Sequence, residues 1–205
     1  IQARIAYIDV NPRKMHQIRE ERRPDFTFLG DAARALDDLT AYAERHGIAI
    51  AIDDWIRHAV ALKRAWPLDY RRDGEALQQA EVLDRLNDRL TDDMIITTGV
   101  GNHQLLAAQY LRMRQPKRFL TSGSFGTMGF GMPVAVGACH ANPDARVVVI
   151  DGDGSFRMNM GELHTIGTLD LPVKVLLLNN HGDGMVRNLE NAAYDDARNL
   201  RAAAA

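Results

Sequence analysis

The sequence lacks the features that mark disulfide-rich, nucleic-acid-binding and membrane-spanning proteins. Its one cysteine, Cys139, excludes an intrachain disulfide and suits a reducing, cytoplasmic compartment. The net charge of −2 gives no electrostatic basis for binding nucleic acid or an anionic membrane. No apolar run approaches the roughly 20 residues of a membrane span. With 205 residues, of which 46% are hydrophobic, the chain can bury one domain-sized core with an appendage.

Common functional motifs are also missing. The sequence contains no G-x-x-x-x-G-K-[ST] loop, no G-x-G-x-x-G fingerprint and no G-x-S-x-G nucleophile elbow. The spacing typical of a metal site is absent among five of its histidines, which are His16, His46, His58, His140 and His164. Function therefore has to be sought in other patterns.

Residues 1–45 are predicted to form part of an α/β unit. A strand at 4–10 precedes a turn at Asn11-Pro12 and a helix, and Asp31 can cap a second helix at 32–43. Without earlier strands this segment cannot complete a sheet, so we expect it to belong to a domain that begins upstream.

A linker is predicted at 46–75, because strand signals are few there. The segment contains a short helical run at 54–65 and the chain breakers Pro67 and Gly74.

Helices and strands alternate in residues 76–205. The predicted strands are 94–98, 119–121, 146–150 and 173–178, and the predicted helices are 75–90, 102–110, 131–139 and 162–169. This alternation favours an α/β fold with a parallel sheet and helices on both faces.

Two of these strands end in polar loops. The strand at 146–150 runs into D-G-D-G-S-F, where Gly152 and Gly154 let the backbone turn sharply and approach a bulky anion. Asp153 offers a carboxylate oxygen, and the strand at 173–178 delivers the amide oxygens of Asn179-Asn180. Such hard ligands suit Mg²⁺ or Ca²⁺. Parallel strands bring both loops to one edge of the sheet, where α/β proteins bind ligands.

Either turn alone is common in proteins, whereas the joint pattern is specific. Strand, G-D-G-S, helix, strand and N-N at this spacing resembles the signature of thiamine diphosphate enzymes. By that resemblance Mg²⁺ is bound by Asp153, Asn180 and the backbone carbonyl of Gly182, and the metal holds the cofactor's diphosphate.

Further segments resemble the catalytic subunit of acetohydroxyacid (acetolactate) synthase. They are Thr98–Gln104, Leu106–Tyr110, Thr121–Pro133, Leu178–Asn180 and Gly184–Val186. The resemblance implies that residues 76–205 form a C-terminally incomplete thiamine diphosphate-binding domain. Residues 1–45 would end a Rossmann-like middle domain that binds FAD in that family, with Asp9 and Asp31 as candidate adenosine-side contacts.

The resemblance also assigns roles to individual residues. Met128 would wedge under the cofactor and bend it, the carbonyl of Gly126 would accept from its 4′-amino group, and Met185 would lie beside it. The implied cofactor-binding residues are Val100, Gly101, Asn102, His103, Gly126, Met128, Gly152, Asp153, Gly154, Ser155, Asn180, Gly182, Gly184 and Met185.

Structural alternatives stay open for these side chains. His103 could face solvent in the first turn of a helix, Ser155 could cap a helix, and Met128 could fill a gap in the core. Met158 and Met160 favour packing roles, and Glu162 a structural or surface role.

The implied reaction decarboxylates pyruvate and condenses the product with a second 2-keto acid. The family's proton-relay glutamate lies on a pyrimidine-binding domain of the neighbouring subunit, and nothing here corresponds to it. We therefore expect a homodimer or homotetramer, with the missing domain on the same longer chain or on a partner. The resemblance also allows for a regulatory subunit.

Alternatives stay open for the second 2-keto acid, which accepts the decarboxylated product, and for the activity itself. Leu189 stands on the implied substrate channel where amino-acid-synthesising members have tryptophan, which argues against 2-ketobutyrate as the acceptor. Another 2-keto acid decarboxylase, oxidase or acetyltransferase of the superfamily, or a non-catalytic cofactor-binding module, is the alternative function.

Overall fold

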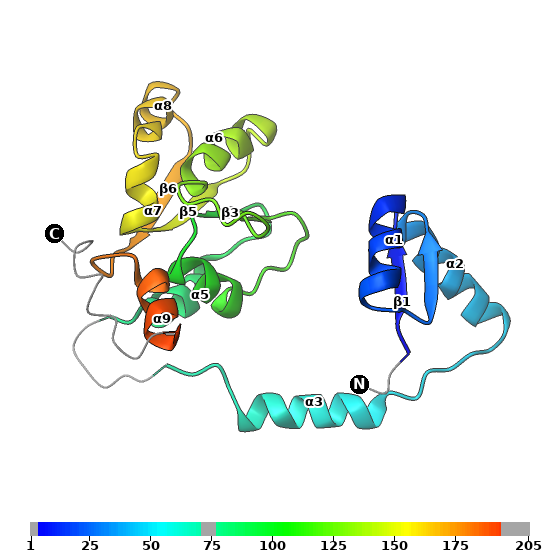
Figure 1. Cartoon of the computed structure of the whole chain (residues 1–205). Coiled ribbons are helices and arrows are strands. Elements are labelled where there is room, and N and C mark those ends of the chain that lie inside the picture. The colour runs from blue at the N-terminus through cyan, green and yellow to red at the C-terminus, as the bar shows by residue number, and fades with distance from the viewer. Residues whose placement is uncertain (1–3, 71–76, 194–205) are drawn as a thin grey trace. The chain divides into compact units, whose positions relative to one another are not determined.

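The computed structural model describes residues 4–70 and 77–193. The chain divides between Pro67 and Leu68 into two compact units, and this division falls inside the predicted linker. Figure 1 shows both units. The predicted breaker Gly74 and the predicted helix start at Glu75 lie outside the described residues.

The first unit contains a two-stranded parallel sheet. Its elements are β1 (Ala6–Asp9), α1 (Pro12–Glu21), β2 (Phe26–Leu29), α2 (Ala32–Arg45) and α3 (Asp53–Ala65). The side chain of Asn11 accepts from the backbone N–H groups of Arg13 and Lys14 and so caps α1. Asp31 accepts from the N–H of Arg34 and caps α2, as predicted.

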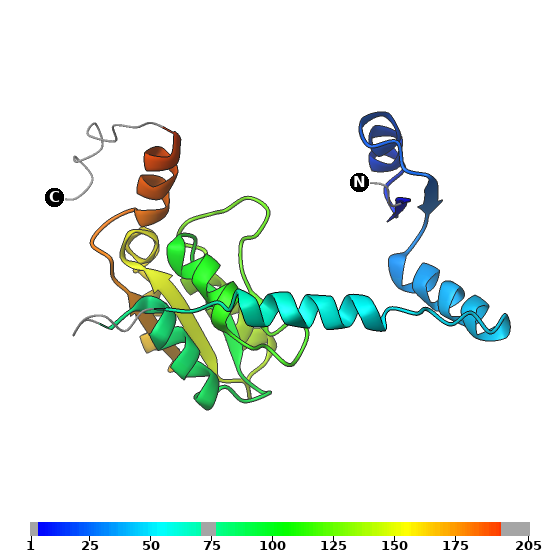
Figure 2. The same cartoon turned by 90° about the horizontal axis from the view of Figure 1, so that it is seen from below.

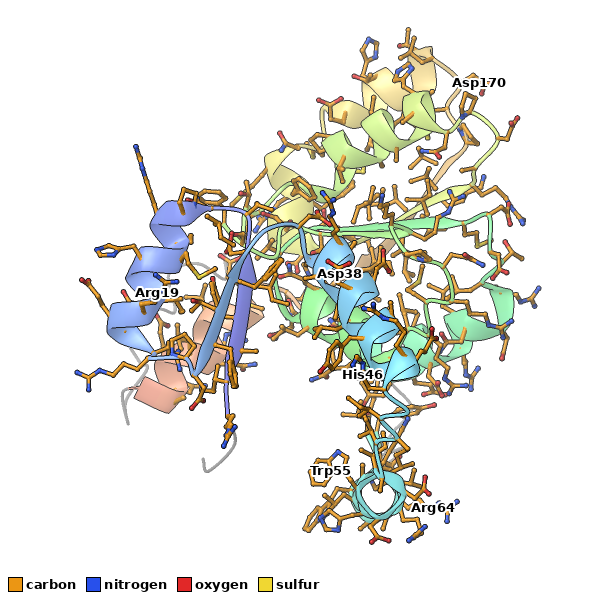
Figure 3. The ribbon with its side chains drawn as sticks, turned by 90° about the vertical axis from the view of Figure 1, so that its right-hand side faces the viewer. Arg19, Asp38, His46, Trp55, Arg64 and Asp170 are labelled. Atoms are coloured by element: carbon orange, nitrogen blue, oxygen red, sulfur yellow. The ribbon has the colours of Figure 1, made fainter. Side chains whose placement is uncertain are left out.

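Much apolar surface of the first unit is exposed. The side of α2 that carries Leu36, Leu39 and Tyr42 is more than half exposed. Helix α3 buries none of its residues, and Trp55 is 67% exposed. Figure 3 shows the side chains of Trp55 and Arg64 projecting from α3 in different directions. Two short strands cannot bury such surface, and the expectation of a larger domain stays a prediction.

The second unit is built on a four-stranded parallel sheet with the order β4-β3-β5-β6. Its strands are β3 (Ile95–Thr98), β4 (Phe119–Leu120), β5 (Val147–Gly152) and β6 (Val173–Leu178). The register places Thr98 opposite Ile150 and Gly152 opposite Leu178. The carboxyl ends of β3, β5 and β6 therefore meet at one edge (Figure 2).

Helices cover both faces of this sheet, which confirms the predicted α/β fold (Figure 1). On one face α4 (Gln79–Leu86) and α5 (Asn102–Tyr110) pack over Ile96 and Ile150. On the other, α6 (Gly131–Ala141) and α8 (Glu162–Thr168) pack over Val147 and Val149. Successive strand residues point to opposite faces, so the run of apolar residues Val147–Ile150 in β5 contributes to the core on both sides of the sheet.

The lone thiol belongs to the core of the second unit. Cys139 on α6 is buried, and burial raises the pKa of its thiol. It is therefore a packing residue rather than a reactive one.

Three elements differ from the sequence prediction. The helix predicted at 75–90 is α4 followed by a 3₁₀ turn at Asn87–Arg89. The crossover between β5 and β6 contains an additional short helix, α7 (Asp153–Met158), before α8. A further helix, α9 (Gly184–Ala193), follows β6.

The break between α7 and α8 has a tertiary cause. The side-chain amide of Asn159 donates to the carbonyl of Gly129 at 2.9 Å, which ties the end of α7 to the segment before α6. Met158 and Met160 beside this break are 59% and 54% exposed, and a Cβ on Gly129 would lie 3.0 Å from the Cβ of Met158, so Met158 packs against that loop.

Among the described residues, no helix has both the length and the apolar character needed to cross a membrane.

Candidate functional site

A pocket of about 230 Å³ lies in the second unit, beyond the carboxyl ends of its strands. Every residue that the sequence indicated as cofactor-binding lies in its wall. The lining comprises Gln79, Val100, Gly101, Asn102, His103, Gly126, Met128, Gly152, Asp153, Gly154, Ser155, Leu178, Asn180, Gly182, Asp183, Gly184, Met185 and Val186. The sheet therefore brings together loops that are far apart in sequence.

One corner of the pocket gathers atoms from two strand ends. A terminal atom of the Asn180 amide lies 3.1 Å from Asp153 Oδ1 and 2.6 Å from the carbonyl oxygen of Gly182. With the amide nitrogen in this position, Asn180 donates to both oxygens. With its amide oxygen there, three oxygen atoms converge, and this is the donor set of a hard cation such as Mg²⁺.

The turn after β6 produces this geometry. His181 and Gly182 both have positive φ angles, 59° and 149°, which reverse the chain so that Gly182 lies next to Asn180. The carbonyl of the Asn179 side chain accepts from the N–H of His181 at 2.8 Å and supports the turn. Asn179 is thus used in the turn, while Asn180 faces the pocket.

The two glycines of the G-D-G segment allow neighbouring side chains to pack closely against the backbone, and they do not form a sharp turn. Neither Gly152 nor Gly154 has a positive φ, and β5 runs directly into α7. A Cβ on Gly152 would lie 2.7 Å from His103 Nδ1, and one on Gly154 would lie 2.2 Å from Asp183 Oδ1. The prediction of a sharp turn here is wrong, whereas close packing at these glycines is observed.

His103 is 4% exposed, so the alternative in which it faces solvent is wrong. Its Nε2 lies 3.2 Å from Oδ1 of Asp151, which is fully buried. The same Asp151 oxygen accepts from the backbone N–H of Gly152 at 3.0 Å. Within the described residues, neither His103 Nε2 nor Asp151 Oδ2 makes a hydrogen bond.

Ser155 connects three segments of the wall. Its hydroxyl oxygen accepts from the N–H of Gly129 at 2.9 Å and from that of Val100 at 3.3 Å. No side-chain cap is present at the start of α7, so Ser155 is not its cap. The hydroxyl fixes the loops after β3 and β4 against α7.

Both methionines that the sequence indicated as cofactor-binding lie in the pocket wall. Met128 is half-buried between loop glycines with positive φ, 64° at Gly126 and 81° at Gly129, and it lines the pocket instead of the core. Met185 also lines it, from the first turn of α9. Leu189 lies one turn later on α9, is 70% exposed and is not in the pocket wall.

Sequence reasoning did not indicate four wall residues: Gln79, Leu178, Asp183 and Val186. Gln79 has no local motif, and its amide donates to the carbonyl of Leu178, which is remote in sequence. Asp183 and Val186 adjoin indicated residues, so the loop itself was the available signal. Glu162, at the start of α8, lies outside the wall, in agreement with a structural or surface role.

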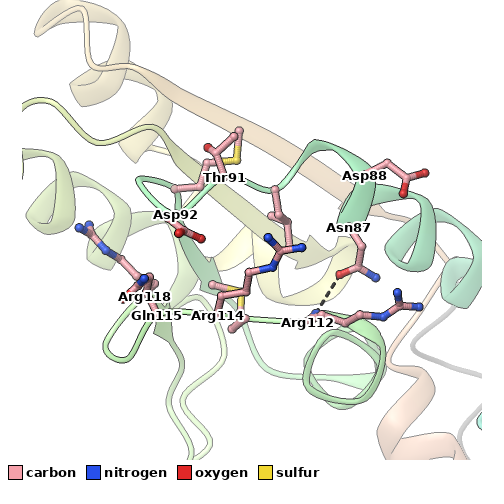
Figure 4. Close-up of a pocket in the computed structure, with 11 residues that line it drawn as sticks. Asn87, Asp88, Thr91, Asp92, Arg112, Arg114, Gln115 and Arg118 are labelled. Atoms are coloured by element: carbon pink, nitrogen blue, oxygen red, sulfur yellow. Dashed lines mark hydrogen bonds between the residues drawn. The ribbon is translucent and has the colours of Figure 1, made fainter.

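A second pocket of about 130 Å³ lies before the amino ends of β3 and β4 (Figure 4). There the backbone N–H of Arg112 donates to Asn87 Oδ1 at 2.8 Å. None of the residues indicated by the sequence lies in its wall. The larger pocket is therefore the candidate site.

Comparison with protein families agrees with this choice. Residues 99–202 match the family model described as thiamine pyrophosphate enzyme, C-terminal TPP binding domain. The chain belongs to the thiamine pyrophosphate enzyme family. The match begins at the first residue after β3 and takes in the loops after all four strands.

Within this family, plant acetolactate synthases resemble the chain over most of its length. Chloroplastic acetolactate synthase of Arabidopsis thaliana is 42% identical over 195 residues, which is 94% of this chain and 28% of that protein. Acetolactate synthase 2 of Nicotiana tabacum is 39% identical over 194 residues, again 94% of this chain and 29% of the relative. The chain thus spans less than a third of these relatives, and the predicted resemblance is confirmed.

The candidate FAD contacts of the first unit are occupied by local bonds. Asp9 accepts from the N–H of Asn11 at 2.7 Å and from the Tyr7 hydroxyl at 3.1 Å, and Asp31 caps α2. Their role toward a flavin stays a prediction.

Proposed function

We propose that this chain supplies the diphosphate- and Mg²⁺-binding part of a thiamine diphosphate-dependent carboligase of the acetolactate synthase type. The observation that carries the proposal is the convergence of Asp153, Asn180 and Gly182 in the wall of a pocket made by the loops after β3, β4, β5 and β6. Family membership supports the cofactor class, and the convergence of oxygen atoms in this corner supports the proposal that its metal binds there.

The metal would be held by Asp153 Oδ1, the amide oxygen of Asn180 and the carbonyl of Gly182. These atoms suit Mg²⁺ because all three are hard oxygen ligands, and phosphate oxygens and water can fill the remaining positions. A dication here would also offset the charge of a diphosphate, which the carboxylate alone would repel.

The diphosphate would be bound by the loop after β3. Gly101 precedes α5 and offers no capping side chain, so the N–H groups of Asn102 and His103 can serve an anion beside the pocket. His103 adds a buried ring at the same wall.

The cofactor's rings would lie toward Met128 and Met185. A half-buried thioether between two glycines can act as a wedge, and the carbonyl of Gly126 lies in the same loop. When bound, the cofactor supplies the carbon–carbon chemistry of 2-keto acids, and the protein binds and orients it.

Assembly is part of the proposal. No counterpart of the proton-relay glutamate was found in the sequence, so the pyrimidine half of the cofactor would be bound by a domain on the longer chain or on a partner subunit. A homodimer or homotetramer is the proposed minimum, with FAD bound next to the first unit. A cytoplasmic location stays a prediction, since the named relatives are chloroplastic.

Calorimetry and turnover together test the function. We expect thiamine diphosphate to bind the 205-residue chain in the presence of Mg²⁺ and to bind far more weakly when EDTA removes the metal. Carbon dioxide release from pyruvate should stay at the uncatalysed rate, because half of the cofactor site is elsewhere. Metal-independent binding would contradict the proposed corner, and enzymatic turnover would contradict the need for a second domain.

The acceptor specificity leads to a separate prediction. Leu189 lies one helical turn from Met185 and three residues after Val186, so it continues the side of α9 that meets the pocket. A methylene in an apolar pocket is worth about 1–3 kcal/mol, or roughly 10–200-fold in specificity. We propose that the complete enzyme condenses two pyruvates, and that Leu189→Trp raises the share of product from 2-ketobutyrate.

A competition assay with both keto acids measures this share. Asn188→Gln, a neighbouring change on α9 that adds no indole, serves as the control. A strong preference of the unmodified enzyme for 2-ketobutyrate would contradict the prediction.

A further inference from the structure

A buried polar pair lies directly beneath the pocket wall. His103 lines the pocket, whereas Asp151 is fully buried behind it and does not line it. The two side chains approach to 3.2 Å, between Nε2 and Oδ1. Within residues 4–70 and 77–193, Asp151 has no other ion-pair partner.

Burial increases the contribution of this contact to the stability of the ionised carboxylate. A carboxylate that loses water without gaining a partner is strongly disfavoured, and Asp151 Oδ1 has the N–H of Gly152 while its Oδ2 has no hydrogen bond. His103 Nε2 likewise lacks one. Among the described residues, the His103 imidazole is the ion-pair partner that lies next to the buried carboxylate, and an N–H at Nε2 would face Asp151 Oδ1.

The surrounding glycines show that this arrangement is closely packed. A Cβ on Gly99 would lie 1.9 Å from Asp151 Oδ1 and 2.2 Å from Ser155 Oγ. Cβ atoms on Gly101 and Gly152 would lie 3.0 Å and 2.7 Å from His103 Nδ1. The Nδ1 edge of the ring therefore rests against two residues of the pocket wall, and the Nε2 edge against Asp151.

We propose that Asp151 is a positioning residue that holds the His103 ring through Nε2 and so presents its Nδ1 edge to the diphosphate of the cofactor. This inference rests on the proposed function. In that orientation an N–H at Nε2 would face the carboxylate behind the ring, and an N–H at Nδ1 could donate to a phosphate in front of it. Carboxylate partners orient metal-bound histidines in the same way.

The location of the proton can be measured without cofactor. The ¹⁵N shifts of the His103 imidazole, identified by their loss in His103→Ala, report which ring nitrogen is protonated. We expect a protonated Nε2 in the unmodified 205-residue chain and a redistribution between the nitrogens in Asp151→Asn. An unprotonated Nε2 in the unmodified chain would overturn the proposal even if Asp151→Asn did not fold.

A double-mutant cycle measures the coupling. Calorimetry with thiamine diphosphate and Mg²⁺ should show affinity falling by about 10- to 100-fold in Asp151→Asn, the usual effect of removing such a partner. In the His103→Ala background the same change should cost less than about 3-fold, because the two residues act as one unit. Asp92→Asn, an exposed carboxylate before β3, is the control and should bind as the unmodified chain does.

The outcomes separate the two claims. Equal losses from Asp151→Asn in both backgrounds would show that Asp151 only supports the fold, and would overturn its positioning role while leaving the proposed function intact. No binding of thiamine diphosphate by the unmodified chain would overturn the proposed function and this role with it.

Discussion

Asp153→Ala is expected to abolish Mg²⁺-dependent binding of thiamine diphosphate. The substitution removes the only carboxylate of the proposed metal corner and leaves the neutral oxygens of Asn180 and Gly182. Since loss of an outer partner of a metal ligand already costs roughly 10–100-fold, loss of the ligand itself should cost more than about 100-fold. Calorimetry with and without Mg²⁺ measures the change.

The control lies at the other end of the same strand. Asp144 is exposed just before β5, whereas Asp153 follows its last residue, so Asp144→Ala alters the charge equally without touching the pocket. Its affinity for the cofactor should match that of the unmodified chain. Unchanged affinity in Asp153→Ala, with the fold intact by circular dichroism, would refute the metal assignment.

Gly131→Ala is expected to destabilise the second unit strongly. Gly131 starts α6 under the loop after β3, and a Cβ there would lie 2.7 Å from the backbone nitrogen of Gly99 and 3.0 Å from the carbonyl carbon of Thr98. Backbone atoms cannot move aside as a side chain can, so the helix has to shift. Overpacking of this kind costs about 1–3 kcal/mol, which lowers Tm by roughly 2–12 °C in a chain of this size.

Gly137→Ala on the same helix separates packing from helix propensity. A Cβ on Gly137 would meet nothing within 4 Å, so this change should raise stability by about 0.5–1 kcal/mol through the lower entropy cost of alanine. Thermal unfolding of both variants measures the difference. Equal Tm values would show that the contact at Gly131 is relaxed at little cost.

The sequence predicted the elements of the site better than its internal contacts. Strand β6 and helix α5 were predicted with their observed bounds, because their apolar runs and glycine turns are local signals. The break after α7 was missed, since it depends on Asn159 bonding to Gly129 in another loop. The burial of His103 was undecided for the same reason, because Asp151 and Gly152 enclose it from a neighbouring strand.

The sequence by itself determined which loops form the site. Strands joined by helical crossovers run parallel, so the D-G-D-G-S-F and N-N loops had to reach one edge of the sheet. Only the tertiary structure decided how the side chains there are used: Asn179 supports a turn and Asn180 faces the pocket, while Asp151 lies behind the wall and Asp153 lies in it. The pattern of apolar residues fixes the order of strands and helices, whereas the role of each polar side chain depends on packing across strands that are distant in sequence.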